Sequence, residues 1–192
     1  GEIIYVSIYF YRFLPVAYVR DRQIFRRAVI SFCCIQLFCF AVYLLLPVTL
    51  TRPELGNINT QFLHWGVALN WLLDQPRNLF PSLHLANAFL VSLLLVHLQP
   101  KLGKACLFWA CLIGYSTLAV KHHLLIDVIS GILLAVLADR FLIAPAIPQT
   151  LSPATFFRRR NLVLVVSLYP ASLLCMYLLW LGGWRPFVWP PA

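Results

Sequence analysis

A series of long apolar runs is the feature that most constrains what this chain can fold into. Six runs approach the roughly 20 residues that an α-helix needs to cross the hydrocarbon core of a bilayer. They cover approximately residues 2–19, 28–48, 83–99, 104–120, 123–144 and 162–182. Hydrophobic residues make up 61% of the chain and charged residues only 11%, about half the usual charged share of a soluble protein. The sequence therefore predicts an all-α, polytopic membrane protein with six transmembrane helices in a bundle. The first run, which contains Arg12 and Pro15, is the weakest of the six.

The fourth and fifth runs must be joined by a turn. Residues 105–138 are nearly all apolar, and as one helix they would extend about 50 Å, far beyond a bilayer core of about 30 Å. The polar residues that interrupt them are Lys121, His122, His123 and Asp127. We therefore expect the chain to turn at the Lys-His-His cluster, which places these side chains and Ser116 near one membrane surface.

The only long polar connection, residues 52–82, lies between the second and third runs. Within it, Thr60 to Leu73 are predicted to form a short helix at the membrane interface, with Trp65 and Trp71 as anchors. No internal repeat divides the chain, so residues 1–192 are expected to form a single membrane-embedded domain.

The net charge of +9 reflects basic loops between apolar runs and not a nucleic-acid-binding face. Basic residues cluster near or after the ends of the first, third and fifth runs, at Arg20, Arg22, Arg26, Arg27, Lys101, Lys104, Arg140, Arg158, Arg159 and Arg160. With six spans these loops share one side, which the positive-inside rule makes cytoplasmic. The other side holds only Arg52, Arg77, Lys121 and Arg185. Most of these lie beside polar clusters, which predicts an anion-binding site on the non-cytoplasmic face (periplasmic, extracellular or lumenal).

The sequence FPSLH, residues 80–84, stands where the polar loop meets the third run. Pro81 suits the first turn of a helix, where its missing N–H costs nothing. Ser82 and the free N–H groups of that turn then form a ready site for a phosphate, and His84 lies within reach of it. Taken alone, the segment favours an ordinary capped helix start with an interfacial histidine.

A second polar group, Ser116, His123 and Asp127, lies in GYSTLAVKHHLLIDVISG. His123 and Asp127 are four residues apart, so on a helix they would share one face and could hydrogen-bond. Such an aspartate fixes the tautomer of the histidine and leaves the other ring nitrogen free to act as a nucleophile. Two alternatives to this catalytic interpretation remain open. Asp127 can be a structural partner of Lys121 or a histidine, or His123 and Asp127 can bind zinc, although no third ligand stands at a suitable spacing.

Three pieces of sequence, in this order, resemble the signature of the type 2 phosphatidic acid phosphatase superfamily: K-x6-R-P, P-S-G-H and S-R-x5-H-x3-D. The first piece is Arg52-Pro53 in TRPELGN, where the guanidinium offers donors suited to phosphate or simply marks the end of a span. The residues that match the other two are Pro81, Ser82, His84, Ser116, His123 and Asp127, followed by Gly131. The resemblance covers roughly residues 45–131 and implies a core of six helices.

Three positions depart from that signature. Leu83 replaces the glycine of the second motif, Leu45 the lysine of the first, and Thr117 the arginine of the third. The residues of both histidine motifs are most similar to those of the branch that contains inositol-phosphorylceramide synthases. A phosphodiester carries one negative charge and a phosphomonoester nearly two. The loss of two cations therefore slightly favours a phosphodiester lipid and transfer to an alcohol, unless Lys121, His122 and Arg77 restore the charge.

The resemblance implies a role for each matching residue. His123 would attack phosphorus and form a phosphohistidine, with Asp127 holding its far nitrogen. His84 would protonate the leaving oxygen and later deprotonate the acceptor. The phosphate oxygens would be held by Arg52, Ser82 and Ser116, with Lys121 or Arg77 in place of the missing cations. The family needs no metal, so no cofactor is expected.

The sequence thus predicts an integral membrane lipid phosphatase or phospholipid head-group phosphotransferase that works without a metal. Its partners would be a lipid phosphate or phospholipid and the bilayer, and the sequence carries no signal for an oligomeric state. Two other classes stay open. One is a non-catalytic lipid-binding protein that retains the fold. The other is a lipid transporter, although no paired halves of inverted topology are visible.

Overall fold

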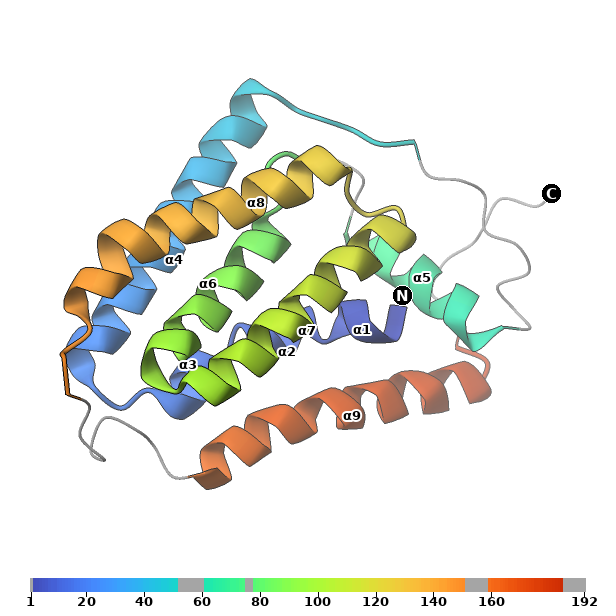
Figure 1. Cartoon of the computed structure of the whole chain (residues 1–192). Helices are drawn as coiled ribbons and strands as arrows, with labels where there is room; N and C mark the ends of the chain where they lie inside the picture. Colours follow the sequence, from blue (N-terminus) through green and yellow to red (C-terminus); the bar gives the residue numbers. More distant parts are fainter. Residues whose placement is uncertain (1, 52–60, 75–77, 151–158, 185–192) are drawn as a thin grey trace.

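The computed structural model describes residues 2–51, 61–74, 78–150 and 159–184, which are mostly helical (Figure 1). In chain order the helices are α1 (Glu2–Val6), α2 (Ile8–Tyr11), α3 (Leu14–Tyr18), α4 (Arg22–Leu45), α5 (Phe62–Leu73), α6 (Leu83–Leu98), α7 (Pro100–Ala119), α8 (Leu125–Ala138) and α9 (Arg159–Leu181). A π-helical turn (Asp139–Ile143) and a 3-10 turn (Ala144–Ala146) continue α8. The predicted all-α fold class is confirmed over the described residues.

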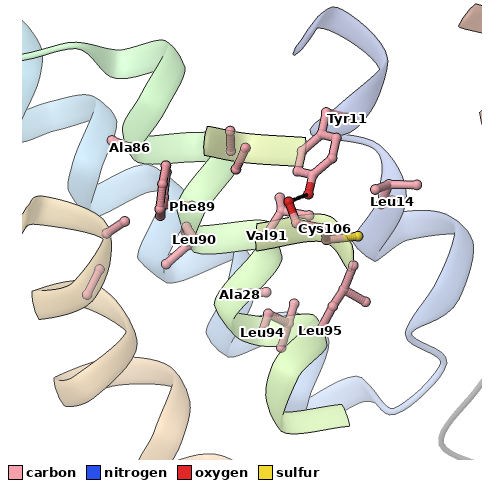
Figure 2. Close-up of a cluster of buried hydrophobic side chains, with 14 of the residues drawn as sticks. Tyr11, Leu14, Ala28, Ala86, Phe89, Leu90, Val91, Leu94, Leu95 and Cys106 are labelled. Atoms are coloured by element: carbon pink, nitrogen blue, oxygen red, sulfur yellow. Dashed lines mark hydrogen bonds between the residues drawn. The ribbon is translucent and has the colours of Figure 1, made fainter. Parts of the chain in front are cut away.

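Helix α6 forms the centre of the bundle. It packs against α4, α7 and α8, and most of its residues are buried, including Leu90, Val91 and Leu94 (Figure 2). Apolar residues lie all around this helix and not on one stripe, and such a helix is stable only where neighbours cover every side. Because His84 lies at the first turn of α6, the central position of the helix also places the candidate site.

Three of the described helices, α4, α7 and α9, are long and apolar enough to cross a membrane. Their outer surfaces are apolar as well: on α4, the side chains of Leu37, Phe38 and Leu44 are exposed. Such surfaces indicate contact with lipid. Helix α6 has 16 residues, or about 24 Å at 1.5 Å per residue, which is less than the hydrocarbon thickness of about 30 Å. The membrane class is therefore supported, whereas the predicted count of six spans is not confirmed.

The run at residues 2–19, predicted as the first span, forms three short helices instead of one. The breaks fall at Ser7 and around Arg12, and Pro15 lies in the first turn of α3, where its missing N–H is harmless. These helices lie against α6, α7 and α9. Tyr11 Oη donates a hydrogen bond to the carbonyl of Cys106 at 2.7 Å (Figure 2). The first run therefore packs inside the bundle and does not form one continuous spanning helix.

The short helix predicted at residues 60–73 is present as α5. Its two tryptophans were expected to anchor in the membrane interface, but both are buried in the protein. The indole N–H of Trp65 donates to the carbonyl of Trp184 at 3.0 Å, and that of Trp71 to the carbonyl of Val120 at 3.2 Å. A buried indole N–H needs such an acceptor, so these residues join α5 to its neighbours, and the predicted anchoring role is wrong.

Candidate active site

The FPSLH segment enters α6 as a capped helix start. Ser82 is the N-cap, its Oγ accepts from the backbone N–H of Leu85 at 3.4 Å, and the helix begins at the next residue. Pro81 therefore precedes the cap, so its predicted place in the first turn is wrong. The Pro81 carbonyl accepts from Tyr43 Oη at 2.8 Å. This contact and the cap fix the backbone that carries His84.

The KHHLLID segment forms the turn that the apolar length requires. The chain reverses between α7 and α8, so the predicted turn at Lys121–His123 is confirmed. Lys121 has a positive φ of 56°, and the N–H of His122 donates to the carbonyl of Thr117 at 2.9 Å. The turn brings both histidines to the end of the bundle where α6 begins.

Two backbone approaches join the FPSLH and KHHLLID segments. The N–H of Ser82 donates to the carbonyl of Asp127 at 3.0 Å. One turn further along α8, a Cβ added at Gly131 would come within 2.4 Å of the Ser82 carbonyl oxygen. Only a residue without a side chain permits that approach. Gly131 therefore lets α8 lie directly against the start of α6.

This packing places the two predicted catalytic histidines side by side. The ring centroids of His84 and His123 are 5.9 Å apart, and the ring planes are inclined by 60°. Phosphoryl transfer needs a nucleophile and a proton donor on opposite sides of one phosphorus atom. Two imidazoles at this separation can serve the same phosphate.

His123 contacts Asp127, but the two are not neighbours on one helix face. His123 lies in the turn before α8 and Asp127 is the third residue of that helix, so the predicted shared face is wrong. The contact is still short, with 3.6 Å between His123 Nδ1 and Asp127 Oδ2. The Asp127 carboxylate is fully buried and accepts from the N–H of Leu124 at 2.8 Å. The turn itself therefore orients the carboxylate.

His123 has an imidazole that is buried and open to a ligand. Its side chain is buried, and in the described part of the chain neither of its ring nitrogens has a hydrogen-bond partner. Most buried polar atoms in proteins are paired. An unpaired buried ring beside an oriented carboxylate makes His123 a candidate for contact with a ligand.

The two serines of the motifs are buried, and their hydroxyls are engaged within the protein. Ser116 Oγ donates to the carbonyl of Ile113 at 2.8 Å, and Ser82 Oγ caps α6. Ser82 is two residues from His84. In the described ranges, no hydrogen bond joins Ser116 Oγ to either histidine. The structure thus brings Ser82 to the pair and leaves Ser116 one turn before the end of α7.

Lys121 lies in the same open groove as His123. The rest of the groove is lined by Leu50, Thr51, Leu118, Leu124 and Leu125. The Lys121 side chain is exposed, so its ammonium group is available to a charged ligand. Arg52, Pro53 and Arg77, the other predicted members of the site, lie outside the described residues.

Asp74 is an acidic neighbour of the site that the sequence reasoning missed. It follows α5, and its Oδ2 accepts from Tyr5 Oη at 3.0 Å and lies 3.4 Å from His122 Nδ1. Burial alone would raise the pKa of Asp74. The contact with His122 and the charges of His84 and His122 outweigh burial and lower the pKa below its usual range. Nothing in the spacing of the sequence marks Asp74, because Tyr5 lies 69 residues away.

A zinc site at His123 and Asp127 would need at least one further protein ligand. Within the part of the chain that the structure describes, no group of three or more His, Cys, Asp or Glu side chains is arranged to hold a metal ion. His123 and Asp127 therefore find no third protein ligand there.

Comparison with known protein families gives a match over half of the chain. The family model of the PAP2 superfamily matches residues 46–144, a segment that contains α5 to α8 and both histidine motifs. No curated protein and no solved structure matches the chain.

Proposed function

The chain belongs to the PAP2 superfamily, and from that premise we propose that it is a membrane enzyme that cleaves a lipid phosphate ester through a phosphohistidine. Membership supports a lipid phosphatase-type function in a membrane. The observation that carries the finer proposal is the pair His84 and His123, whose rings are 5.9 Å apart, with Asp127 beside His123.

In the first step, His123 attacks phosphorus. The carboxylate of Asp127 faces Nδ1 of the ring, so it favours the tautomer that carries its proton there and leaves Nε2 as the nucleophile. As the P–N bond forms, the P–O bond to the leaving alcohol breaks. Protonated His84 gives its proton to that oxygen. The phosphoryl group stays on His123.

In the second step, the hydroxyl of an acceptor attacks the phosphohistidine. The new P–O bond forms as the P–N bond breaks, and neutral His84 takes the proton of the acceptor. Water as acceptor gives hydrolysis, and an alcohol gives phosphotransfer. The two activities therefore use the same residues and differ only in what enters the site.

The phosphate oxygens would be held by the motif residues Arg52, Ser82 and Ser116, with Lys121 or Arg77 in place of the missing cations. Ser82 stands at the positive end of the α6 dipole, where an anion is favoured. Lys121 lines the groove beside His123. The hydroxyls of the two serines would turn toward the phosphate from their present partners, the N–H of Leu85 for Ser82 and the carbonyl of Ile113 for Ser116.

The missing cations slightly favour a phosphodiester substrate and head-group transfer. Leu45 is an exposed apolar residue at the end of α4, and Thr117 is buried with its hydroxyl bonded to the carbonyl of Gly114 at 2.8 Å. Neither residue supplies positive charge, and Asp74 adds a negative charge nearby. A phosphodiester, with one charge, tolerates this better than a phosphomonoester with nearly two. The similarity of the histidine motifs to the inositol-phosphorylceramide synthase branch also favours a phosphodiester substrate.

The site would face the non-cytoplasmic side of the membrane. The starts of α4 and α7 and the end of α8 lie at one end of the bundle, and the start of α6, the end of α7 and the start of α8 lie at the other (Figure 1). Arg22, Lys101 and Arg140 belong to the first group. By the positive-inside rule, the end with the histidines faces away from the cytoplasm.

Incubation of the purified protein with labelled phospholipids and lipid monophosphates tests the proposal. We expect turnover that vanadate, a phosphate mimic, inhibits and EDTA leaves unchanged. His123→Ala and His84→Ala should each lower the rate by about 10³-fold or more. Release of phosphate from monoesters alone would overturn the head-group transferase. Unchanged activities in both variants would favour a lipid-binding protein or a lipid transporter.

A further inference from the structure

Asp74 is held at the edge of the site by two elements distant in the sequence. Tyr5 in α1 donates its hydroxyl proton to Oδ2 at 3.0 Å, and Nδ1 of His122 lies 3.4 Å from the same oxygen. The side chain of Asp74 is 33% exposed, whereas that of His122 is only 1% exposed. An ionised carboxylate with two such partners has a fixed position.

Tyr5 joins this carboxylate to the catalytic pair. Its ring stacks on His122 with centroids 4.3 Å apart and planes inclined by 7°. The same ring lies 5.8 Å from the ring of His84. The charge of His84 is also one of the causes that lower the pKa of Asp74. The interaction is mutual, so an ionised Asp74 stabilises the charged form of His84 as much as charged His84 stabilises ionised Asp74.

Burial of His84 lowers the pKa of its ring, and most of the charges around it also disfavour a proton there. The groups that face it from neighbouring elements are Tyr5, Tyr9, Arg12, His122, His123 and Asp74. Arg12 is positive, and either neighbouring histidine is positive when protonated. Asp74 supplies the negative charge in that group, so it offsets the repulsion.

We infer that Asp74 is a positioning residue that favours the protonated form of His84, and that Tyr5 and His122 hold Asp74 in place. The inference rests on the proposed role of His84 as the general acid. Asp74 neither gives nor takes a proton in the reaction, because its field alone stabilises the cation that donates to the leaving oxygen.

The variant Asp74→Asn tests this through a pH profile. The acid form of His84 is required, so loss of the negative charge should move the alkaline limb of kcat/KM to lower pH by about one unit. The rate should then fall about tenfold on the alkaline side and stay within about twofold on the acid side. A purely structural role for Asp74 would lower the rate equally at every pH, and that result would overturn the inference.

Two further variants sharpen the test. Tyr5→Phe keeps the ring and removes only the donor to Asp74, so it should move the limb in the same direction by a smaller amount. Asp139→Asn is the matched control. It removes a carboxylate that lies 3.0 Å from Nε2 of His97, at the opposite end of α6, and should leave the limb in place.

Titration of labelled histidines by NMR in detergent micelles provides a readout that needs no turnover. The signal that disappears in His84→Gln identifies the residue, and its midpoint should move to lower pH in Asp74→Asn. If the protein has no lipid phosphatase activity but the midpoint shifts, the proposed function is refuted and the electrostatic link between Asp74 and His84 stands. An unmoved midpoint would refute the link alone. If Asp74→Asn does not fold, the Tyr5→Phe titration decides by the same criterion.

Discussion

Replacement of Gly131 by alanine tests how closely α8 must approach the start of α6. The added Cβ would lie 2.4 Å from the Ser82 carbonyl oxygen, whereas ordinary contacts begin near 3.4 Å. The atom it meets belongs to the backbone, so a side chain cannot rotate away. The helices must separate by about 1 Å, and overpacking of this kind costs about 1–3 kcal/mol. The hydrogen bond from the N–H of Ser82 to Asp127 would lengthen with them.

The activity should suffer more than the stability, because a displacement of about 1 Å in a catalytic constellation lowers rates by about 10²-fold. We expect kcat to fall by that factor while detergent-solubilised protein still unfolds cooperatively. Gly114→Ala is the matched control. Its Cβ would meet side-chain atoms and no backbone, namely Leu85 Cδ1 at 3.2 Å and Val128 Cγ1 at an ordinary 3.8 Å, so kcat should stay within a few-fold. Equal activities for Gly131→Ala and the native protein would refute the claim that this approach assembles the site.

Three other changes test separate contacts. Asp127→Asn removes the charge beside His123 and should lower kcat by about 10³-fold with little change in KM. A rise in KM with kcat unchanged would contradict the assigned role. Lys121→Ala should raise KM about twofold to fivefold and leave kcat nearly unchanged, because an exposed cation contributes about 1 kcal/mol or less. Tyr11→Phe should lower the free energy of unfolding by about 1–2 kcal/mol, because the buried carbonyl of Cys106 loses its donor. Unchanged denaturant unfolding in micelles would show that the Tyr11 hydroxyl is dispensable.

The helical class and the turn between α7 and α8 follow from the sequence for a simple reason. Bilayer thickness limits how long an apolar helix can be, and residues 105–138 exceed that limit. The polar residues 121–123 then mark the turn. The pairing of two histidines about forty residues apart follows from the family motifs, because the FPSLH segment alone favours an ordinary capped helix start.

The first run shows where composition misleads. An apolar stretch of this length is compatible with a span or with a broken segment buried in protein, and tertiary contacts decide between them. Tyr11 pairs with the carbonyl of Cys106 (Figure 2), and Tyr5 reaches Asp74. Neither contact leaves a local pattern in the sequence, so the packing of this segment beside the candidate site was not predictable.

His123 and Asp127 are in contact as predicted, but the structural reason for the contact differs from the predicted one. A four-residue spacing favours a shared helix face, but the helix begins only at Leu125. The contact forms because the N–H of Leu124 holds the carboxylate at the start of α8. A helix start and a helix face can place the same two side chains together, and only the capping contact distinguishes them.

The central claim is that His123 carries the phosphoryl group. Protein incubated briefly with a phospholipid labelled in its phosphate, quenched with alkali and separated from lipid, should retain label in an acid-labile, base-stable form. His123→Ala should retain none, and Asp139→Asn should retain as much as the native protein. Equal labelling of His123→Ala and the native protein, or turnover by His123→Ala at the native rate, would contradict the account.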